Sequence, residues 1–226
     1  MDFRHVTTWI FDLDHTLYAP EVRLFAQIER RMTAYVMRTL GVPEAEASHL
    51  REHYWRQHGT TLAGLMAEHG VEPMAYLRDV HDIDFSALTP DPELAALIRA
   101  LPGRKIVHTN GDSAYAARVL EHRGLTVFDA VHGVDTVDFH PKPDARAYAA
   151  VQAAEGFDPG QAAMFEDDPR NLLVPHRLGM QTILVGCGQR GPDMAEPGQP
   201  RDAHVRHQTL DLTGFLRDLS QDRATV

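Results

Sequence analysis

The sequence predicts an α/β fold, in which helices cover both faces of a parallel sheet and a helical insert follows the first strand. Three observations indicate this. Short apolar runs alternate with amphipathic helical stretches in the second half of the chain, a rhythm typical of βαβ units. A long stretch with helical periodicity and no strand signal follows the first apolar run. Polar and acidic residues stand where several of the predicted strands end.

The first strand is predicted at residues 6–10, a short apolar run typical of a strand buried in a parallel sheet. It leads directly into Asp12 and Asp14. Residues i and i+2 of an extended chain point the same way, so we expect these two carboxylates to lie side by side. Adjacent carboxylates repel each other unless a cation or a proton separates them. The pair therefore indicates a metal site, an acid/base pair, or both, whereas a solvated turn would not explain the apolar strand that precedes it.

The segment after this strand predicts helices only. Apolar residues recur at helical spacing through 20–41, and Gly41 ends that stretch. Three further helical stretches are bounded by Gly, Pro or capping residues: 43–58, 61–69 and 73–80. We therefore expect residues 19–90 to form a small helical domain, inserted into a core made of residues 1–18 and 91–226.

Strands and helices alternate in the rest of the chain. The apolar runs predict strands at 105–109, 127–132, 162–166 and 182–185. Helical periodicity predicts helices at 113–122, 144–155, 169–178 and 211–219. Residues 187–202 hold several Gly and Pro and predict a loop.

Composition narrows the classes of partner. The formal net charge of −10 argues against a nucleic-acid polymer or an anionic membrane surface as the binding partner. It does not exclude a small phosphorylated metabolite as the ligand. A single cysteine, Cys187, excludes an intramolecular disulfide and favours a reducing compartment, so we expect a cytoplasmic protein. The chain shows no signal-peptide pattern and no apolar run long enough to span a membrane.

Two further polar motifs follow the next predicted strands. Thr109, Asn110 and Gly111 offer a hydroxyl, an amide and accessible backbone N–H groups, which suit an anion at a helix N-terminus. Lys142 lies between two prolines, which restrict its backbone. We expect this lysine to hold a phosphate or to offset the carboxylates after the first strand. Taken singly, the first of these motifs has a capped helix start as its alternative interpretation, and the second has a solvated lysine in a turn.

The fourth motif is the acidic run Glu166, Asp167 and Asp168. Three consecutive acids at a strand end are costly to bring together unless something positive binds there. Hard oxygen ligands without His or Cys at metal-binding spacing indicate magnesium, not zinc. A solvated acidic turn is the alternative for this run alone. All four motifs are predicted at the carboxyl ends of strands, where open α/β sheets bind ligands, and their combination favours a shared site.

The ordered set Asp-x-Asp-x-Thr, Thr-Asn-Gly, Lys-Pro and Glu-Asp-Asp resembles the haloacid dehalogenase superfamily of phosphotransferases over nearly the whole chain. The resemblance implies a Rossmann-like three-layer core, with the helical insert as a cap. Within the superfamily, residues 60–66, 80–84 and 164–171 are similar to the pyrimidine 5′-nucleotidase branch.

The resemblance also implies chemical roles. Asp12 would be the nucleophile that forms an aspartyl-phosphate, and carboxylates do serve as covalent nucleophiles. Asp14 would protonate the leaving oxygen and then accept a proton from the attacking water. Mg²⁺ would be held by Asp12, by Asp167 and by the backbone carbonyl of Asp14.

The remaining motif residues would bind substrate or support the site. Thr109, Asn110, Gly111 and Lys142 would surround the transferring phosphoryl group, where developing charge needs preorganised donors. Three residues would assist the loop or the metal from nearby: Thr16, Glu166 and Asp168.

The predicted function is a magnesium-dependent phosphatase of a small phosphate monoester, with a pyrimidine nucleoside 5′-monophosphate as the expected substrate. A sugar-phosphate phosphatase or a phosphomutase is the first alternative, and a non-catalytic binding module is the second. The acid at position 14 favours hydrolysis. Dehalogenation is disfavoured because loss of a halide needs neither the lysine nor the acidic cluster.

Overall fold

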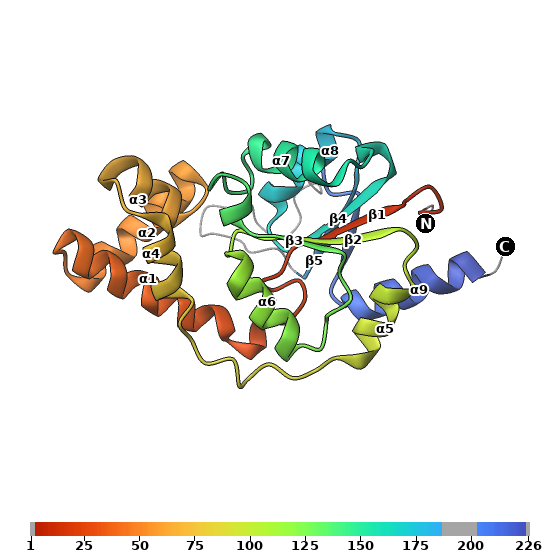
Figure 1. Ribbon diagram of the computed structural model, residues 1–226, viewed down its shortest axis with the longest axis horizontal. Coiled ribbons are helices and arrows are strands. Elements are labelled where there is room, and N and C mark those ends of the chain that lie inside the picture. Colours follow the sequence, from red (N-terminus) through yellow and green to blue (C-terminus); the bar gives the residue numbers. More distant parts are fainter. Residues whose placement is uncertain (1–2, 187–202, 225–226) are drawn as a thin grey trace.

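The computed structural model describes residues 3–186 and 203–224. Its centre is a parallel sheet with the strand order β3-β2-β1-β4-β5-β6 (Figure 1). The strands are β1 (Thr8–Phe11), β2 (Arg104–His108), β3 (Ala130–His132), β4 (Ala162–Glu166), β5 (Gln181–Val185) and β6 (His207–Thr209). The predicted α/β fold with a parallel sheet is confirmed.

Strand β1 lies in the middle of the sheet, between β2 and β4. Alternate side chains of a strand point to opposite faces, so the core is divided in two by the sheet. Ile10 packs with Tyr148 of α7 (Ala145–Glu155) on one face. Phe11 belongs to the cluster on the other face, where its ring stacks on Phe165 with centroids 4.6 Å apart.

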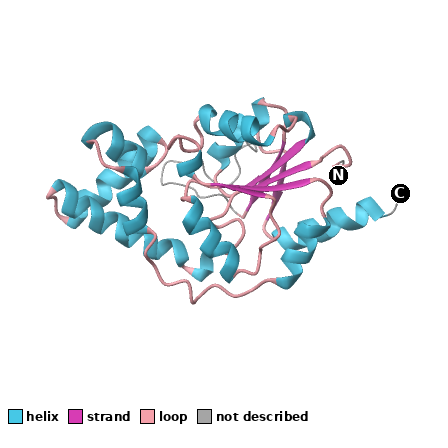
Figure 2. Cartoon of the chain, viewed as in Figure 1, coloured by secondary structure: helices cyan, strands magenta, loops and turns pink. Residues whose placement is uncertain are grey.

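Helices cover both faces and complete three layers (Figure 2). One face carries α7 and α8 (Leu173–Arg177), and the other carries α5 (Pro92–Ala100), α6 (Ser113–His122) and α9 (Leu212–Ala224). Short 3₁₀ turns join these elements at Pro20–Val22, Val134–Thr136, Pro159–Gln161 and Pro169–Leu172. Asp112 caps α6 by accepting a hydrogen bond from the backbone N–H of Tyr115 at 2.7 Å. This cap orients the first turn of α6 next to the end of β2.

The four helices between β1 and α5 pack against one another at one end of the molecule (Figure 1). They are α1 (Leu24–Leu40), α2 (Glu44–His58), α3 (Thr61–His69) and α4 (Pro73–Val80), and residues 24–80 are called the helical insert below. Arg31 and Arg38 of α1 both bind Asp79 of α4, which joins the first and last helices of the insert. In the described residues no strand lies between β1 and β2, as predicted.

Several details differ from the sequence prediction. Helix α5 was not predicted, although Asp91 supplies its N-cap and apolar residues recur along one face. Strand β6 is a short, polar edge strand, which leaves no apolar signal. Residues 169–178 form a 3₁₀ turn followed by α8, where one helix was predicted. The predicted loop at 187–202, including Cys187, lies outside the described residues.

The position predicted for Lys142 was also wrong in one respect. Strand β3 ends at His132, and the 3₁₀ turn Val134–Thr136 separates that strand end from the lysine. Lys142 instead lies in the loop that leads into α7, and only the other three motifs directly follow strands.

Within residues 3–186 and 203–224, none of the helices has both the length and the apolar composition needed to span a membrane.

The helical insert contains a buried tyrosine whose hydroxyl has no hydrogen-bond partner among the described residues. Tyr76 is 2% exposed, and its ring packs edge-on against Tyr35. An unsatisfied buried polar group costs about 1–3 kcal/mol, so Tyr76→Phe is expected to stabilise the fold by about 1 kcal/mol. Urea unfolding measures this. The control is Tyr54→Phe, because the Tyr54 hydroxyl is 2.7 Å from His69 Nε2. Equal destabilisation by both variants would contradict the prediction.

Candidate active site

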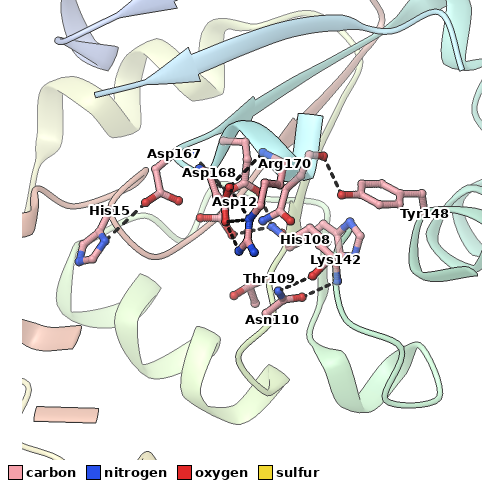
Figure 3. A network of polar contacts seen from close by, with 12 residues as sticks. Asp12, His15, His108, Thr109, Asn110, Lys142, Tyr148, Asp167, Asp168 and Arg170 are labelled. Atoms are coloured by element: carbon pink, nitrogen blue, oxygen red, sulfur yellow. Dashed lines mark hydrogen bonds and ion pairs between the residues drawn. The ribbon is translucent and has the colours of Figure 1, made fainter. Parts of the chain in front are cut away.

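Three neighbouring strands end at the same level of the sheet. Phe11 of β1 is in register with Val107 of β2 and with Phe165 of β4. The chain continues from these strands into Asp12, Thr109 and Asp167, and Lys142 reaches the same place from its loop (Figure 3). The structure therefore gathers residues from all four predicted motifs at one end of the sheet.

Lys142 is the centre of this cluster and is 1% exposed. Its ammonium donates three hydrogen bonds: to Asp12 Oδ1 at 2.7 Å, to Glu166 Oε2 at 2.6 Å and to the carbonyl oxygen of His108 at 2.8 Å. Burial by itself lowers the pKa of the lysine, but the two carboxylates outweigh burial and raise that pKa above its usual value. The lysine is therefore a fixed positive charge that offsets Asp12 and Glu166. The sequence analysis expected it to offset both Asp12 and Asp14 if it did not hold a phosphate, and in the structure it pairs with Asp12 but not with Asp14.

Three acids lie together beside the lysine. One carboxylate oxygen from each of Asp12, Glu166 and Asp167 lies within 4.8 Å of the others. Burial, and next the charge of Glu166, raises the pKa of Asp12 to about 7. Burial also raises the pKa values of Glu166 and Asp167. The three groups therefore resist ionising together unless a further positive charge is present.

The residues present fit a divalent cation. Three carboxylates face one ammonium, which leaves two negative charges to be offset when all are ionised. The buried oxygen Oδ2 of Asp167 forms an ion pair with His15 Nδ1 at 3.5 Å but has no hydrogen-bond partner among the described residues, so this oxygen keeps the capacity to bind a cation. The cluster offers only oxygen atoms, which are the ligands that Mg²⁺ prefers. Asp12, Glu166 and Asp167 are the side chains that would hold it.

Glu166 and Asp168 have different surroundings. Glu166 Oε1 accepts hydrogen bonds from the backbone N–H groups of Asp167 and Asp168, each at 3.2 Å, which fixes it within the cluster. The carboxylate of Asp168 instead forms a two-point ion pair with the guanidinium of Arg170. That guanidinium also lies over the ring of Trp55 in the helical insert, 3.5 Å from its centroid. Arg170 thus connects the acidic loop with α2, and Asp168 orients Arg170.

His15 borders the acidic cluster and has no counterpart in the sequence prediction. Its Nδ1 is 3.5 Å from Asp167 Oδ2, and its backbone has a φ of 60°. Burial lowers its pKa, but the neighbouring carboxylate of Asp167 outweighs burial and raises it overall.

Thr16 is also buried, and its Oγ1 has no hydrogen-bond partner among the described residues. The backbone N–H of Thr16 donates to the carbonyl of Leu13 at 3.3 Å, so this residue supports the turn of the loop.

The motif after β2 holds the lysine loop. The amide of Asn110 donates to the backbone carbonyl of Lys142 at 3.0 Å and accepts from its backbone N–H at 2.7 Å. Thr109 is buried, and its hydroxyl oxygen accepts a hydrogen bond from the N–H of Gly111 at 3.0 Å. Asn110 therefore fixes the position of Lys142, a task that sequence spacing did not indicate.

Asp14 does not pair with the lysine. Its Oδ1 accepts hydrogen bonds from the hydroxyls of Tyr18 and Tyr115, the second at 2.6 Å. The charge of Asp14 still acts on Asp12, since it is one of the causes that raise the pKa of Asp12. Neither tyrosine had been assigned a site role. Tyr18 lies two residues after Thr16, the last residue of the first motif. Tyr115 comes from α6, and no sequence signal connects it with Asp14.

Comparison with known proteins identifies the family of this chain. The family model for haloacid dehalogenase-like hydrolases matches residues 6–179, which include all four motifs. The chain belongs to this family. The family assignment agrees with the predicted superfamily, and it makes the chain a hydrolase by family, with the Rossmann-like core described above.

Two curated proteins and one solved structure are similar to this chain. Validoxylamine A 7′-phosphate phosphatase of Streptomyces hygroscopicus subsp. limoneus is 27% identical over 83% of this chain and 89% of its own length. Phosphate metabolism protein 8 of Saccharomyces cerevisiae is 23% identical over 78% of this chain, which spans 60% of that longer protein. A magnesium-bound HAD hydrolase of Bacillus subtilis has a similar structure, with a TM-score of 0.57, 17% identity and coverage of 96% and 98% of the two chains. Of the two curated relatives, the one from Streptomyces is named a phosphatase, and the solved structure shares the fold of this chain.

Proposed function

We propose that this hydrolase is a magnesium-dependent phosphatase that cleaves a small phosphate monoester through a phosphorylated Asp12. The observation that carries the proposal is the position of Asp12 at the end of β1. It is buried, it is held at Oδ1 by Lys142, and it lies against two further carboxylates. A nucleophilic carboxylate fixed in this way matches the need of phosphoryl transfer for positioning and charge stabilisation.

In the proposed reaction the carboxylate of Asp12 attacks phosphorus while the bond from phosphorus to the leaving oxygen breaks. Asp14 gives its proton to that oxygen, and the alcohol leaves. Water then attacks the phosphoryl group, Asp14 takes a proton from this water, and the bond between phosphorus and Asp12 breaks to release phosphate. When bound, Mg²⁺ supplies positive charge that offsets both the acids and the phosphoryl oxygens.

The other motif residues support these steps. Thr109, Asn110 and Gly111 lie at the end of β2 and would present donors to the phosphoryl oxygens. Lys142 keeps Asp12 in place and offsets its charge. We also propose that residues 19–90 act as a cap over a core of residues 1–18 and 91–226, with the contact of Arg170 and Trp55 between them. A cap that closes would exclude water and select the leaving group.

Pyrimidine nucleoside 5′-monophosphates are the substrates proposed first. This rests on the likeness of residues 60–66, 80–84 and 164–171 to the pyrimidine 5′-nucleotidase branch. The single cysteine and the net charge of −10 are in keeping with a cytoplasmic enzyme that acts on a small metabolite. A sugar-phosphate substrate is the second candidate, because the relative from Streptomyces is named for a phosphate that is not a nucleotide.

The test is an assay of phosphate release with Mg²⁺ over UMP, CMP, dUMP, dTMP, AMP, GMP, glycolate phosphate and hexose phosphates. Release selective for pyrimidine nucleotides, lost with EDTA and in Asp12→Asn, is expected. Release from hexose phosphates alone would keep the phosphatase and overturn the nucleotide assignment. An isomerised sugar phosphate without free phosphate would identify a mutase, and no turnover of any substrate would favour a binding module.

A further inference from the structure

We propose that Tyr18 and Tyr115 are positioning residues for Asp14, which hold its carboxylate through Oδ1 and leave Oδ2 as the oxygen that carries the transferred proton. This inference rests on the proposed phosphatase function and deepens it. It assigns a task to two buried tyrosines that none of the four motifs explains.

The geometry places both hydroxyls on one oxygen. Tyr18 and Tyr115 each donate to Asp14 Oδ1, and their own hydroxyl oxygens lie 3.4 Å apart. The two residues are 3% and 1% exposed, respectively. Burial, and next the charge of Asp14, raises the pKa values of both tyrosines well above the usual value. Both hydroxyls therefore keep their protons and act as donors toward Asp14.

A carboxylate oxygen has about two acceptor positions, and here both positions of Oδ1 are taken by hydroxyl donors. The proton of a neutral Asp14 then belongs on Oδ2, because a proton on Oδ1 would break at least one of these bonds. In the reaction the Oδ2–H bond breaks as the leaving oxygen takes the proton. In the second step Oδ2 recovers a proton from water. The tyrosines thus select one oxygen for both transfers.

Tyr115 is itself held on three sides. Asp112 Oδ1 accepts from the backbone N–H of Tyr115, and Asp112 Oδ2 accepts from His81 Nδ1 at 2.7 Å. The imidazole of His81 stacks on the Tyr115 ring, with centroids 4.2 Å apart and 13° between the planes. A Cβ at Gly111 would lie 2.7 Å from Cδ1 of this ring, so the glycine makes room for it. Such support holds a side chain in one orientation, as preorganised catalysis requires.

The supporting residues come from distant parts of the chain. His81 follows α4, where the chain leaves the helical insert, and Asp112 and Tyr115 belong to the start of α6. Phe85 also contacts the Tyr115 ring, with centroids 6.0 Å apart. The orientation of Asp14 therefore depends on how the chain returns from the helical insert to the sheet.

The experiment compares leaving groups in Tyr18→Phe, Tyr115→Phe and the double variant. Benzyl phosphate loses an alkoxide, which must be protonated, whereas p-nitrophenyl phosphate loses a stabilised phenolate, which need not be. General acid catalysis contributes about 10²–10⁴-fold, so we expect kcat/KM for benzyl phosphate to fall about 10- to 100-fold in the double variant. For p-nitrophenyl phosphate kcat/KM is expected to change little. This ratio is measured because kcat/KM reports the step that breaks the bond to the leaving group.

Two reference variants complete the design. Asp14→Asn is expected to show the same selective loss. Tyr76→Phe changes a buried tyrosine far from the four motifs in sequence, and it is expected to keep the wild-type kcat/KM on both substrates. Thermal unfolding checks that each variant folds. If the double variant does not fold, the two single tyrosine variants are compared on both substrates instead. Equal losses on both substrates, or no loss on either, would overturn the positioning role. A wild-type protein that cleaves neither substrate nor any other phosphate would instead overturn the phosphatase function on which this role depends.

Discussion

Asp12→Asn is expected to reduce phosphate release by about 10⁴–10⁶-fold, the range seen when a residue of a covalent catalytic unit is removed. The amide cannot form the acyl-phosphate bond, but its carbonyl oxygen still accepts a hydrogen bond from Lys142, so the fold should persist. The measurement is phosphate release under Mg²⁺ with substrate in excess, beside a control for contaminating phosphatases. Release at more than about a tenth of the wild-type rate would exclude Asp12 as the nucleophile.

The same variant is expected to stabilise the metal-free fold. Burial raises the pKa of Asp12 from its ordinary value of 3.8 to about 7. The folded chain therefore binds a proton that the unfolded chain has already released, and the wild type loses stability as the pH rises from about 4 through 7. At about 1.36 kcal/mol for each pKa unit, the cost is on the order of 4 kcal/mol above pH 7. An asparagine at this position would carry no such cost.

Urea unfolding in EDTA at pH 5 and pH 8 checks this. The stability difference between Asp12→Asn and the wild type is expected to grow with pH and to shrink when Mg²⁺ replaces EDTA. A difference that is the same at both pH values would contradict a raised pKa of Asp12. A difference that Mg²⁺ leaves unchanged would count against Asp12 as a metal ligand.

Lys142→Met is expected to destabilise the fold by about 3–5 kcal/mol, because removal of one partner leaves buried charges uncompensated. Asp12 and Glu166 would lose their shared ammonium, and the carbonyl of His108 would lose a donor. Urea unfolding at pH 8 in EDTA measures the loss, and phosphate release is expected to disappear with it.

The matched control is Lys105→Met. This lysine pairs with the more exposed Asp129 at 3.6 Å, and a pair of this kind contributes about 0–1 kcal/mol. The double variant Lys142→Met with Glu166→Gln should recover part of the lost stability, since one buried charge is removed together with its partner. A loss below about 1 kcal/mol for Lys142→Met would contradict the central role given to the lysine.

Part of the site was predictable because it depends on local order along the chain. Asp12, Thr109 and Asp167 each come directly after an apolar strand, and parallel strands bring their carboxyl ends to one edge of the sheet. The motif residues could therefore be placed together before any contact was known. Helix α5 could have been predicted from its capping Asp91 and its apolar spacing, whereas the polar strand β6 carried no such signal.

The partners of these residues were not predictable. Glu166 and Asp168 are two residues apart and both carry a carboxyl group, yet one binds Lys142 and the other binds Arg170. Asp14 meets Tyr115, which lies 101 positions later in the chain. Such pairings depend on side-chain directions and on how helices pack over the sheet, which periodicity does not report.

The sequence by itself thus determined the α/β fold, the helical insert and the set of acids, lysine and polar residues at the sheet edge, because strand periodicity and motif position are local properties. Only the tertiary structure decided which two carboxylates face the lysine, which one faces two tyrosines and which one faces an arginine. The physical reason is that a buried charge is stable only beside a suitable partner, and that partner is chosen by packing among residues far apart in the chain.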